Sequence, residues 1–218
     1  PAAAEHDRVR GFTIADVKRA SPFVLAPLAG VSDSPFRRLA REQGASAVYT
    51  EMVSSDGLVR GSQATLEYCA FDPSERPIGI QVFGSDPGIM ADAARVLSEL
   101  PAEQRPDLID INMGCPVRKV VNRCAGAALL QDVPRIAAIV ERMSAATPLP
   151  VTAKIRSGWD ANQKNYLQMA DVLGAAGVAA LAVHPRTRAP GYSGKADWPV
   201  IADTKRHVGH AFPILGNG

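Results

Sequence analysis

The stretch "LIDINMGCPVRKV", residues 108–120, decides how this chain folds. Its first half is the apolar run of a strand, but Asp110 and Asn112 interrupt the run at alternate positions. Gly114 then breaks the strand, and the thiol of Cys115 follows, with a proline fixing the backbone behind it. A buried strand that ends in polar groups and a constrained loop is typical of parallel sheets, whose strand ends carry function.

Similar apolar runs recur about every 30 residues along the chain. Each run is short, rich in Val, Ile or Ala and bounded by Pro or Gly, as strands buried on both faces are. Segments with helical period separate them, and several of these begin with Asp or Ser followed by Pro. We expect strands within 23–30, 47–52, 77–84, 108–114, 150–158, 179–186 and 213–218, and helices within 32–44, 85–100, 132–143 and 165–177. The segment 54–76 is more irregular, and we expect an active-site loop and a short helix there.

The position of the polar residues separates two folds that share this rhythm, an open doubly wound sheet and a (β/α)8 barrel. Nearly every expected strand has a polar group at its carboxyl end. An open sheet concentrates its site at one switch point, whereas a barrel gathers all its strand ends at one mouth. No glycine-rich nucleotide fingerprint follows the first strand. We therefore predict an α/β fold of the (β/α)8 TIM-barrel class, incomplete, with about seven βα units.

Composition narrows the class of protein. The 218 residues are 46% hydrophobic and 21% charged, as in ordinary globular proteins, and a net charge of +2 neither indicates nor excludes a nucleic-acid partner. No apolar run approaches the ~20 residues of a membrane span, and the first residues do not form a signal peptide. Three cysteines without metal or framework spacing suit a reducing compartment. We expect a cytoplasmic monomer with no metal and no membrane partner.

Four polar side chains at the ends of four expected strands form the first candidate site: Gln81, Lys154, His184 and Asn217. A buried strand does not tolerate Lys or His unless the side chain meets a partner. Taken singly, each residue is as well explained by a satisfied residue of the barrel. Together they supply donors, a cation and an amide, which suits a flavin, because a Lys stabilises the negative charge of its reduced ring. The same groups would also hold a sugar phosphate, so both ligands stay open.

Cys115 forms the second candidate site. Free cysteines are most often small buried hydrophobes, and we expect this of Cys69 and Cys124. The position of Cys115 in a loop between glycine and proline favours a nucleophile or an acid instead. No histidine lies near it in the sequence to act as a base, and an ordinary thiol is mostly protonated at neutral pH. A proton donor to carbon is therefore the better interpretation.

Eight stretches, in order from about Phe23 to the last residue, carry a resemblance to a known family: "APLAGVSDSPFR", "EMVSS", "QVFGSDP", "DINMGCPVRKV", "AGAALL", "VTAKIRSGW", "HPRTRAPGYSGKADW" and "ILGNG". The combination of "NMGCP", "KIRSGW" and "HPRTR" is specific, although each motif alone is weak. With these stretches the chain resembles the tRNA-dihydrouridine synthases, a flavoprotein family also described as nifR3-like barrels, and its bacterial B-type branch in particular.

The resemblance implies a reaction and a set of roles. In this family NADPH reduces FMN, the flavin passes hydride to C6 of a uridine in tRNA, and a cysteine protonates C5, which gives 5,6-dihydrouridine. The resemblance places this acid at Cys115 and a contact to the uracil at Asn112. The target base must be extruded from the RNA into the barrel mouth. The residues expected to bind FMN are Pro27, Leu28, Ala29, Gln81, Lys154, His184, Asn217 and Gly218.

The loop "HPRTRAPGYSGKADW" is the expected tRNA contact. Arg186, Arg188 and Lys195 lie in it, with Tyr192 and Trp198 among them. Basic and aromatic side chains around a mouth suit phosphates and unstacked bases. A solvated loop with Trp198 packed beneath it explains each residue singly as well.

Two other functions stay open. Another FMN-dependent barrel oxidoreductase, acting on a small pyrimidine or a dihydroorotate-like substrate, would share the barrel and the flavin lysine. It would not be expected to carry "NMGCP" together with this basic loop. An RNA-binding or assembly protein that has lost catalysis is disfavoured, because Cys115, Lys154 and His184 are intact together.

The chain divides into a lead-in over residues 1–22 and one FMN-binding catalytic domain over residues 23–218. Within the lead-in, "GFTIADVKRASPF" resembles a hairpin that closes the barrel floor. The resemblance places an eighth strand, a glycine-arginine element for the FMN phosphate and a helical tRNA-binding domain after Gly218. We therefore expect a chain that stops there to bind FMN weakly or not at all.

Overall fold

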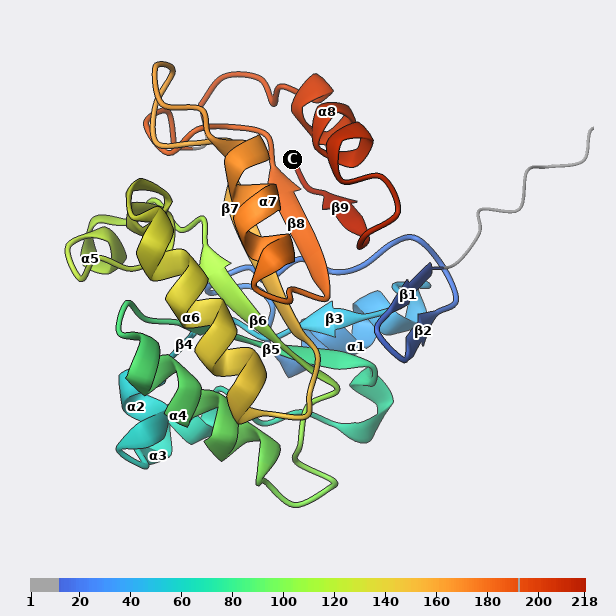
Figure 1. Ribbon diagram of the computed structural model, residues 1–218. Coiled ribbons are helices and arrows are strands. Elements are labelled where there is room, and N and C mark those ends of the chain that lie inside the picture. Colours follow the sequence, from blue (N-terminus) through green and yellow to red (C-terminus); the bar gives the residue numbers. More distant parts are fainter. Residues whose placement is uncertain (1–11, 192) are drawn as a thin grey trace, which may run out of the picture.

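The computed structural model describes residues 12–191 and 193–218, and its frame is a curled parallel sheet (Figure 1). β3 and β4 both pair in parallel with β5, and from β5 to β9 each strand pairs in parallel with the next. Because every crossover is parallel, the carboxyl ends of the strands gather at one edge. The predicted α/β fold, an incomplete TIM barrel, is confirmed. The strands are β3 (Val48–Tyr49), β4 (Val53–Ser54), β5 (Ile78–Phe83), β6 (Leu108–Met113), β7 (Val151–Arg156), β8 (Ala180–His184) and β9 (Ile214–Gly216).

The first expected strand is reduced to a single bridge. Val24 pairs with Ala47 in parallel, and the Leu25 N–H donates to the Ala47 carbonyl. Pro22 and Pro27 flank this segment, and a proline has no N–H to contribute to a ladder. The second expected strand, 47–52, is reduced to β3, and β4 begins directly after its end.

Helices cover the outer face of the sheet, with α4, α6 and α7 side by side over its central strands (Figure 1). Three helices begin at an aspartate whose carboxylate accepts the N–H three residues later, with a proline in the first turn. Among the described helices, none combines the length and the apolar character needed to cross a bilayer. The three with aspartate caps are α1 (Ser34–Glu42), α4 (Pro87–Ser98) and α6 (Val133–Ala146).

One full-length helix, α8 (Pro199–Val208), was not predicted. Its N-cap residue is Trp198, which makes no side-chain capping bond, so the usual start signal is missing. The predicted helix in 165–177 is α7 (Tyr166–Ala175). Segment 54–76 contains short helices where one was predicted, and the active-site loop expected there stays a prediction. The short elements are α2 (Ser55–Val59), α3 (Gln63–Glu67), α5 (Arg118–Val121), η1 (Pro73–Glu75) and η2 (Gly126–Gln131).

Side chains alternate between two apolar layers because successive residues of a strand point to opposite faces. Ile80 and Ile155 are fully buried in the main core, which the sheet forms with the helices. Tyr49 and Leu108 belong to a smaller cluster inside the curl, together with Ile14 from the N-terminal hairpin. The floor of the curl is therefore apolar.

The predicted hairpin at the barrel floor is confirmed. β1 (Phe12–Ile14) and β2 (Val17–Arg19) pair in antiparallel register, and Ile14 is fully buried in the floor cluster. Gly79 makes room for this packing, since a Cβ there would lie 2.5 Å from Leu108 Cδ1 and 2.6 Å from Tyr49 Cδ1. Any larger residue at position 79 would collide with the floor.

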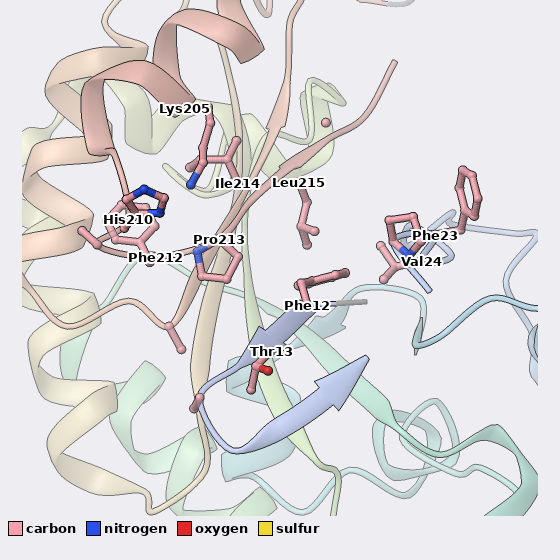
Figure 2. A pocket seen from close by; sticks show the side chains of 15 residues that line it. Phe12, Thr13, Phe23, Val24, Lys205, His210, Phe212, Pro213, Ile214 and Leu215 are labelled. Atoms are coloured by element: carbon pink, nitrogen blue, oxygen red, sulfur yellow. The ribbon is translucent and has the colours of Figure 1, made fainter. Parts of the chain in front are cut away.

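A cavity of about 740 Å³ opens at this floor end (Figure 2). Phe12 of β1, Val24, and Ile214 and Leu215 of β9 line it. Val24 and β9 are the two ends of the curled sheet, so this cavity is the gap between those ends. None of the residues predicted for the functional site lines it.

A buried ion pair anchors α1 to the loop before β5. The Arg37 Nε donates to Glu75, whose carboxylate also accepts from the Ser34 hydroxyl. The remaining Arg37 donors reach the carbonyls of Ser32 and Ala70, at 2.8 and 2.9 Å. Every side of this guanidinium is satisfied, so the position of α1 depends on it.

Replacing Glu75 with Ala is expected to lower the free energy of unfolding by about 3–5 kcal/mol, because Arg37 would stay buried without its counter-ion. Urea unfolding followed by circular dichroism measures the change. Arg95→Ala is the matched control, since the Arg95–Asp92 pair on α4 is half exposed and contributes at most about 1 kcal/mol. A loss for Glu75→Ala no larger than that of the control would contradict the anchoring role.

Candidate active site

The strand ends meet in one pocket at the carboxyl edge of the sheet. The two candidate sites of the sequence analysis, the polar strand ends and the thiol, are thereby joined. Gly218 adjoins this pocket through His184, because a Cβ on it would lie 3.2 Å from His184 Nδ1. The predicted residues that line the pocket are Pro27, Leu28, Ala29, Gln81, Asn112, Cys115, Lys154, His184 and Asn217.

Strand register explains why these residues converge. Gln81 is paired with Asp110, and Asp110 with Thr152, so these three side chains form one layer inside the curl. Asn112 is paired with Lys154 two residues further along, which makes a second layer nearer the strand ends. The polar interruptions of the apolar runs are therefore the inward-facing positions of β5, β6 and β7.

A chain of hydrogen bonds joins the deeper layer to residues 114–117, here called the thiol loop. Gln81 Nε2 donates to Asp110 at 2.6 Å, and Gln81 Oε1 accepts from Asn112 Nδ2 at 2.8 Å. Asn112 Oδ1 accepts from the backbone N–H groups of Gly114 and Cys115, at 3.2 and 2.9 Å. The amide of Asn112, predicted to hold the substrate, thus also shapes the loop that carries the thiol.

The thiol loop rests on the turn η2. The Ala127 N–H donates to the Cys115 carbonyl at 3.0 Å. Gly126 has a φ of +59°, and a Cβ on it would lie 2.8 Å from that carbonyl oxygen, so only glycine allows this close approach. The Cys115 side chain is partly exposed on the pocket wall, where a ligand can reach it.

The other two cysteines lie outside the pocket. Cys69 is buried, as predicted, and burial raises the pKa of its thiol to about 12. The prediction that Cys124 is buried is wrong, because it is exposed in a turn after α5 with a φ of +56°. In the described part of the chain, no three His, Cys, Asp or Glu side chains are placed to hold a metal.

Lys154 places a positive charge in the pocket. Burial lowers the pKa of its ammonium from 10.5 to about 8, although the Asp110 carboxylate opposes this fall. Burial raises the pKa of Asp110, which hydrogen bonds from Gln81 and, at 2.7 Å, from Thr152 counteract. Both oxygens of Asp110 accept these bonds, as the ionised form requires. At neutral pH Lys154 is therefore mostly protonated above a buried carboxylate.

His184 is held in one tautomer. Its Nδ1 lies 2.7 Å from the Asn217 carbonyl, which only accepts, so Nδ1 carries the proton. Burial lowers the pKa of the imidazole, and the positive charges of Lys154 and Arg156 lower it further. The opposite nitrogen, Nε2, is buried and has no partner in the described structure. A neutral His184 therefore offers one unsatisfied acceptor to a ligand.

Arg156 is a site residue that the sequence analysis did not name. Its Nε donates to the Gly114 carbonyl at 2.8 Å, and its Nη1 donates to the carbonyls of Thr187 and Gly191, at 2.9 and 2.7 Å. It therefore ties the thiol loop to the basic loop after β8. A signal was present, since a buried arginine two residues after Lys154 faces the same side of the strand.

Asp110 was noted as a polar interruption of its strand but was given no role in the site, and Met52 was missed. Asp110 is almost completely buried in β6, and a charged residue within an apolar strand was the available signal. Met52 lines the pocket, and its sulfur lies 3.6 Å from Asn112 Nδ2. Nothing in the sequence distinguishes this methionine from a core residue.

The predicted tRNA contacts lie beside the pocket and do not line it. Arg186 Nη2 donates to the Gly194 carbonyl of its own loop at 2.9 Å. The guanidinium of Arg188 stacks on the ring of Trp159, 4.4 Å from the ring centroid. Lys195 is exposed. This loop therefore offers positive charge next to the mouth.

The two aromatic residues predicted for this loop differ in what the structure describes. Trp198 is 56% exposed at the start of α8, so it is not packed beneath the loop. Tyr192 lies outside the described residues. A stacking role for Trp198 in RNA binding stays a prediction.

Lys154→Met is expected to raise the free energy of unfolding at pH 7 by up to about 3 kcal/mol, because burial depresses the pKa of Lys154. The penalty on the charged amine is complete below the folded pKa of about 8 and disappears as the pH rises to 10.5. Urea unfolding of both proteins across this range measures it. The difference between the two proteins removes the pH dependence that comes from titrating groups present in both, such as Cys69. An equal gain at both ends of the range would contradict this explanation.

Comparison with known proteins agrees with this arrangement. A sequence model of the family described as "Dihydrouridine synthase (Dus)" matches residues 24–218. The tRNA-dihydrouridine synthase B of Pseudomonas aeruginosa is 44% identical over 195 residues, which cover 89% of this chain and 57% of the relative. The protein of the same name from Pseudomonas syringae pv. tomato is 45% identical over 195 residues, or 89% and 56% of the two chains.

A more distant relative gives the same result. The "Probable tRNA-dihydrouridine synthase" of Rickettsia bellii is 36% identical over 206 residues, or 94% of this chain and 61% of the relative. The chain thus spans a little over half of the length of the curated relatives that it matches. By motif, by family match and by the fold of its sheet, the chain belongs to the dihydrouridine synthase family.

Proposed function

We propose that the full-length protein reduces the C5=C6 bond of a uridine in tRNA to 5,6-dihydrouridine. One observation carries this proposal: a thiol, an ammonium group and a neutral imidazole line a single pocket at the barrel mouth. The relatives reported above bear the name of this activity, which supports a tRNA substrate. A lead-in over residues 1–22 and a catalytic domain over residues 23–218 remain the proposed division of the chain. Cytoplasmic location and a monomeric state remain predictions.

FMN fits the chemistry of the pocket. Pro27, Leu28 and Ala29 form one wall, and Lys154 supplies a positive charge. The buried Nε2 of His184 accepts a hydrogen bond that no described residue donates. When bound, FMN supplies a hydride for C6 of the uracil, and NADPH is the proposed reductant that renews it. The other proposed FMN contacts are Gln81, Asn217 and Gly218.

Cys115 is the proposed acid. Hydride addition at C6 leaves an electron pair that C5 takes up, and Sγ of Cys115 gives its proton to C5. The thiol is suited to this step because the thiol loop is held by Asn112 and by η2 on the pocket wall. Lys154 places its charge in the same pocket and favours negative charge that develops there. Asn112 is also the proposed contact to the uracil.

The basic loop after β8 is the proposed contact to the tRNA backbone. Arg186, Arg188 and Lys195 lie beside the pocket, and Arg156 ties their loop to the thiol loop. Because the target base has to leave its stack to reach the pocket, phosphate contacts at the mouth would hold the flanking nucleotides.

Cys115→Ala is expected to lower the rate of dihydrouridine formation by about 10²–10⁴-fold, since the substitution removes the acid. Mass spectrometry of tRNA treated with the full-length protein, FMN and NADPH measures the product. Cys124→Ala is the matched control, because Cys124 is exposed outside the pocket, and it should retain the wild-type rate. Flavin absorbance should be equal in both variants. A fully active Cys115→Ala protein would refute the assignment of the acid.

Lys195→Ala is expected to weaken tRNA binding and to reduce the slope of log K against log salt by about 0.7–0.9, the loss of one phosphate contact. Filter binding over a range of salt concentrations measures the slope. Lys205→Ala provides the control, because Lys205 lies at the floor cavity at the far end of the barrel (Figure 2). Equal slopes for the two variants would exclude a specific role of this loop.

A further inference from the structure

Asp110 lies below the pocket and does not line it. Its side chain is almost fully buried, and both of its oxygens accept a hydrogen bond, one from Thr152 and one from Gln81. An ionised carboxylate has no donor, so it dictates which end of a neighbouring amide faces it. The Gln81 amide can therefore meet Asp110 only through its NH₂ group.

This constraint passes along the whole chain of hydrogen bonds. With its NH₂ group toward Asp110, Gln81 presents Oε1 to Asn112, which must donate a hydrogen bond from its own NH₂ group. Asn112 Oδ1 then faces the opposite way, toward the N–H groups of Gly114 and Cys115. If either amide turned over, two donors or two acceptors would meet, and the N–H groups of the thiol loop would lose their acceptor.

We propose that Asp110 is a positioning residue of the active site, which sets the direction of the Gln81 and Asn112 amides and thereby holds Cys115 in place, while its negative charge supports the protonated form of Lys154. The inference rests on the proposed function for its meaning, but its geometry does not depend on a bound flavin.

The second role of Asp110 follows from position and charge. Asp110 and Lys154 line the same small cavity, of about 40 Å³. A carboxylate near a buried ammonium favours the charged form of that ammonium. The pKa of Lys154 is accordingly higher than burial alone would leave it. A neutral residue at position 110 would lower that pKa further.

Glu75 shows what a purely structural buried carboxylate looks like in this chain. It is fully buried and bonded to Arg37, Ser34 and the Asp72 N–H, all on the α1 side of the molecule. Through Arg37 and Ser32 its bonds lead to the backbone of Leu28 on the opposite wall of the pocket, and none of these bonds involves the thiol loop. Glu75 is therefore a matched control for Asp110.

Two substitutions in the flavin-free full-length protein separate the two roles of Asp110, which are to orient the amides of Gln81 and Asn112 and to supply a negative charge. Asp110→Leu removes the acceptor, so Gln81 is free to turn over and the thiol loop loosens. Asp110→Asn preserves the orientation of the Gln81 and Asn112 amides, because the oxygen of the new side chain accepts from Gln81. Thr152 then rotates its hydroxyl to accept from the new NH₂ group. Peptide mass spectrometry measures the rate at which iodoacetamide alkylates Cys115.

Asp110→Leu is expected to change the alkylation rate of Cys115 by about fivefold or more, while Asp110→Asn and Glu75→Leu stay within about twofold of the wild type. A wild-type rate in Asp110→Leu, or an equal change in Glu75→Leu, would overturn the proposal. If Asp110→Leu does not fold, Gln81→Leu interrupts the same chain of hydrogen bonds at Gln81, the residue that Asp110 contacts. The same change in rate is then expected, and a wild-type rate in the folded protein would refute the proposal.

The charge is tested by the pH dependence of FMN affinity in the full-length protein. Wild-type affinity should fall as the pH rises through about 8, where Lys154 loses its proton. In Asp110→Asn this fall should occur at lower pH, and an unchanged profile would refute the role of the charge. If the wild-type protein binds no FMN at any pH, the proposed function fails, while the alkylation result still decides the positioning role.

Discussion

Parallel register along β5, β6, β7 and β8 is the constraint on which the whole site depends. It places every second side chain inside the curl, so that Gln81, Asp110 and Asn112 face inward while Ile80 and Ile111 face the helices. A slip of one residue in any strand would exchange the two sets, burying amides among the helices and leaving isoleucines at the pocket. The apolar core against the helices therefore fixes the position of the groups that line the pocket as well as the fold.

The sequence was sufficient where a local rule and the global fold agree. Asp33 and its equivalents in α4 and α6 mark their helices, because the capping side chain, the proline and the apolar period all indicate a helix start at the same place. It was insufficient where tertiary partners decide. The first strand is cut to a bridge at Val24 between two prolines, and α8 begins without a capping side chain. Cys124 was misjudged because residue type says little about the burial of one thiol in a turn.

The residues of the candidate site also fall into two groups, those that the sequence identifies and those that only the structure shows. Residue type identified Cys115, Lys154 and His184, since a thiol in a constrained loop and charges in apolar strands are unusual by themselves. Arg156 was overlooked and Asp110 was given no role, although both are equally unusual, because their importance lies in what they bond. Loops far apart in the chain determine which carbonyls a guanidinium reaches and which way an amide turns. No spacing rule in the sequence contains that information.

A polar layer inside a barrel is costly, and the rest of the molecule has to offset it. Asp110 is almost completely removed from water and Lys154 partly so, and burial shifts each toward its neutral form, so the pair contributes little net stability. The apolar floor around Tyr49 and Leu108 and the core against the helices supply the compensating burial. Since an apolar pair in place of Lys154 and Asp110 would stabilise the fold, stability alone does not explain them. This costly arrangement fixes the charge of Lys154 in the same pocket as the thiol of Cys115 before a ligand binds.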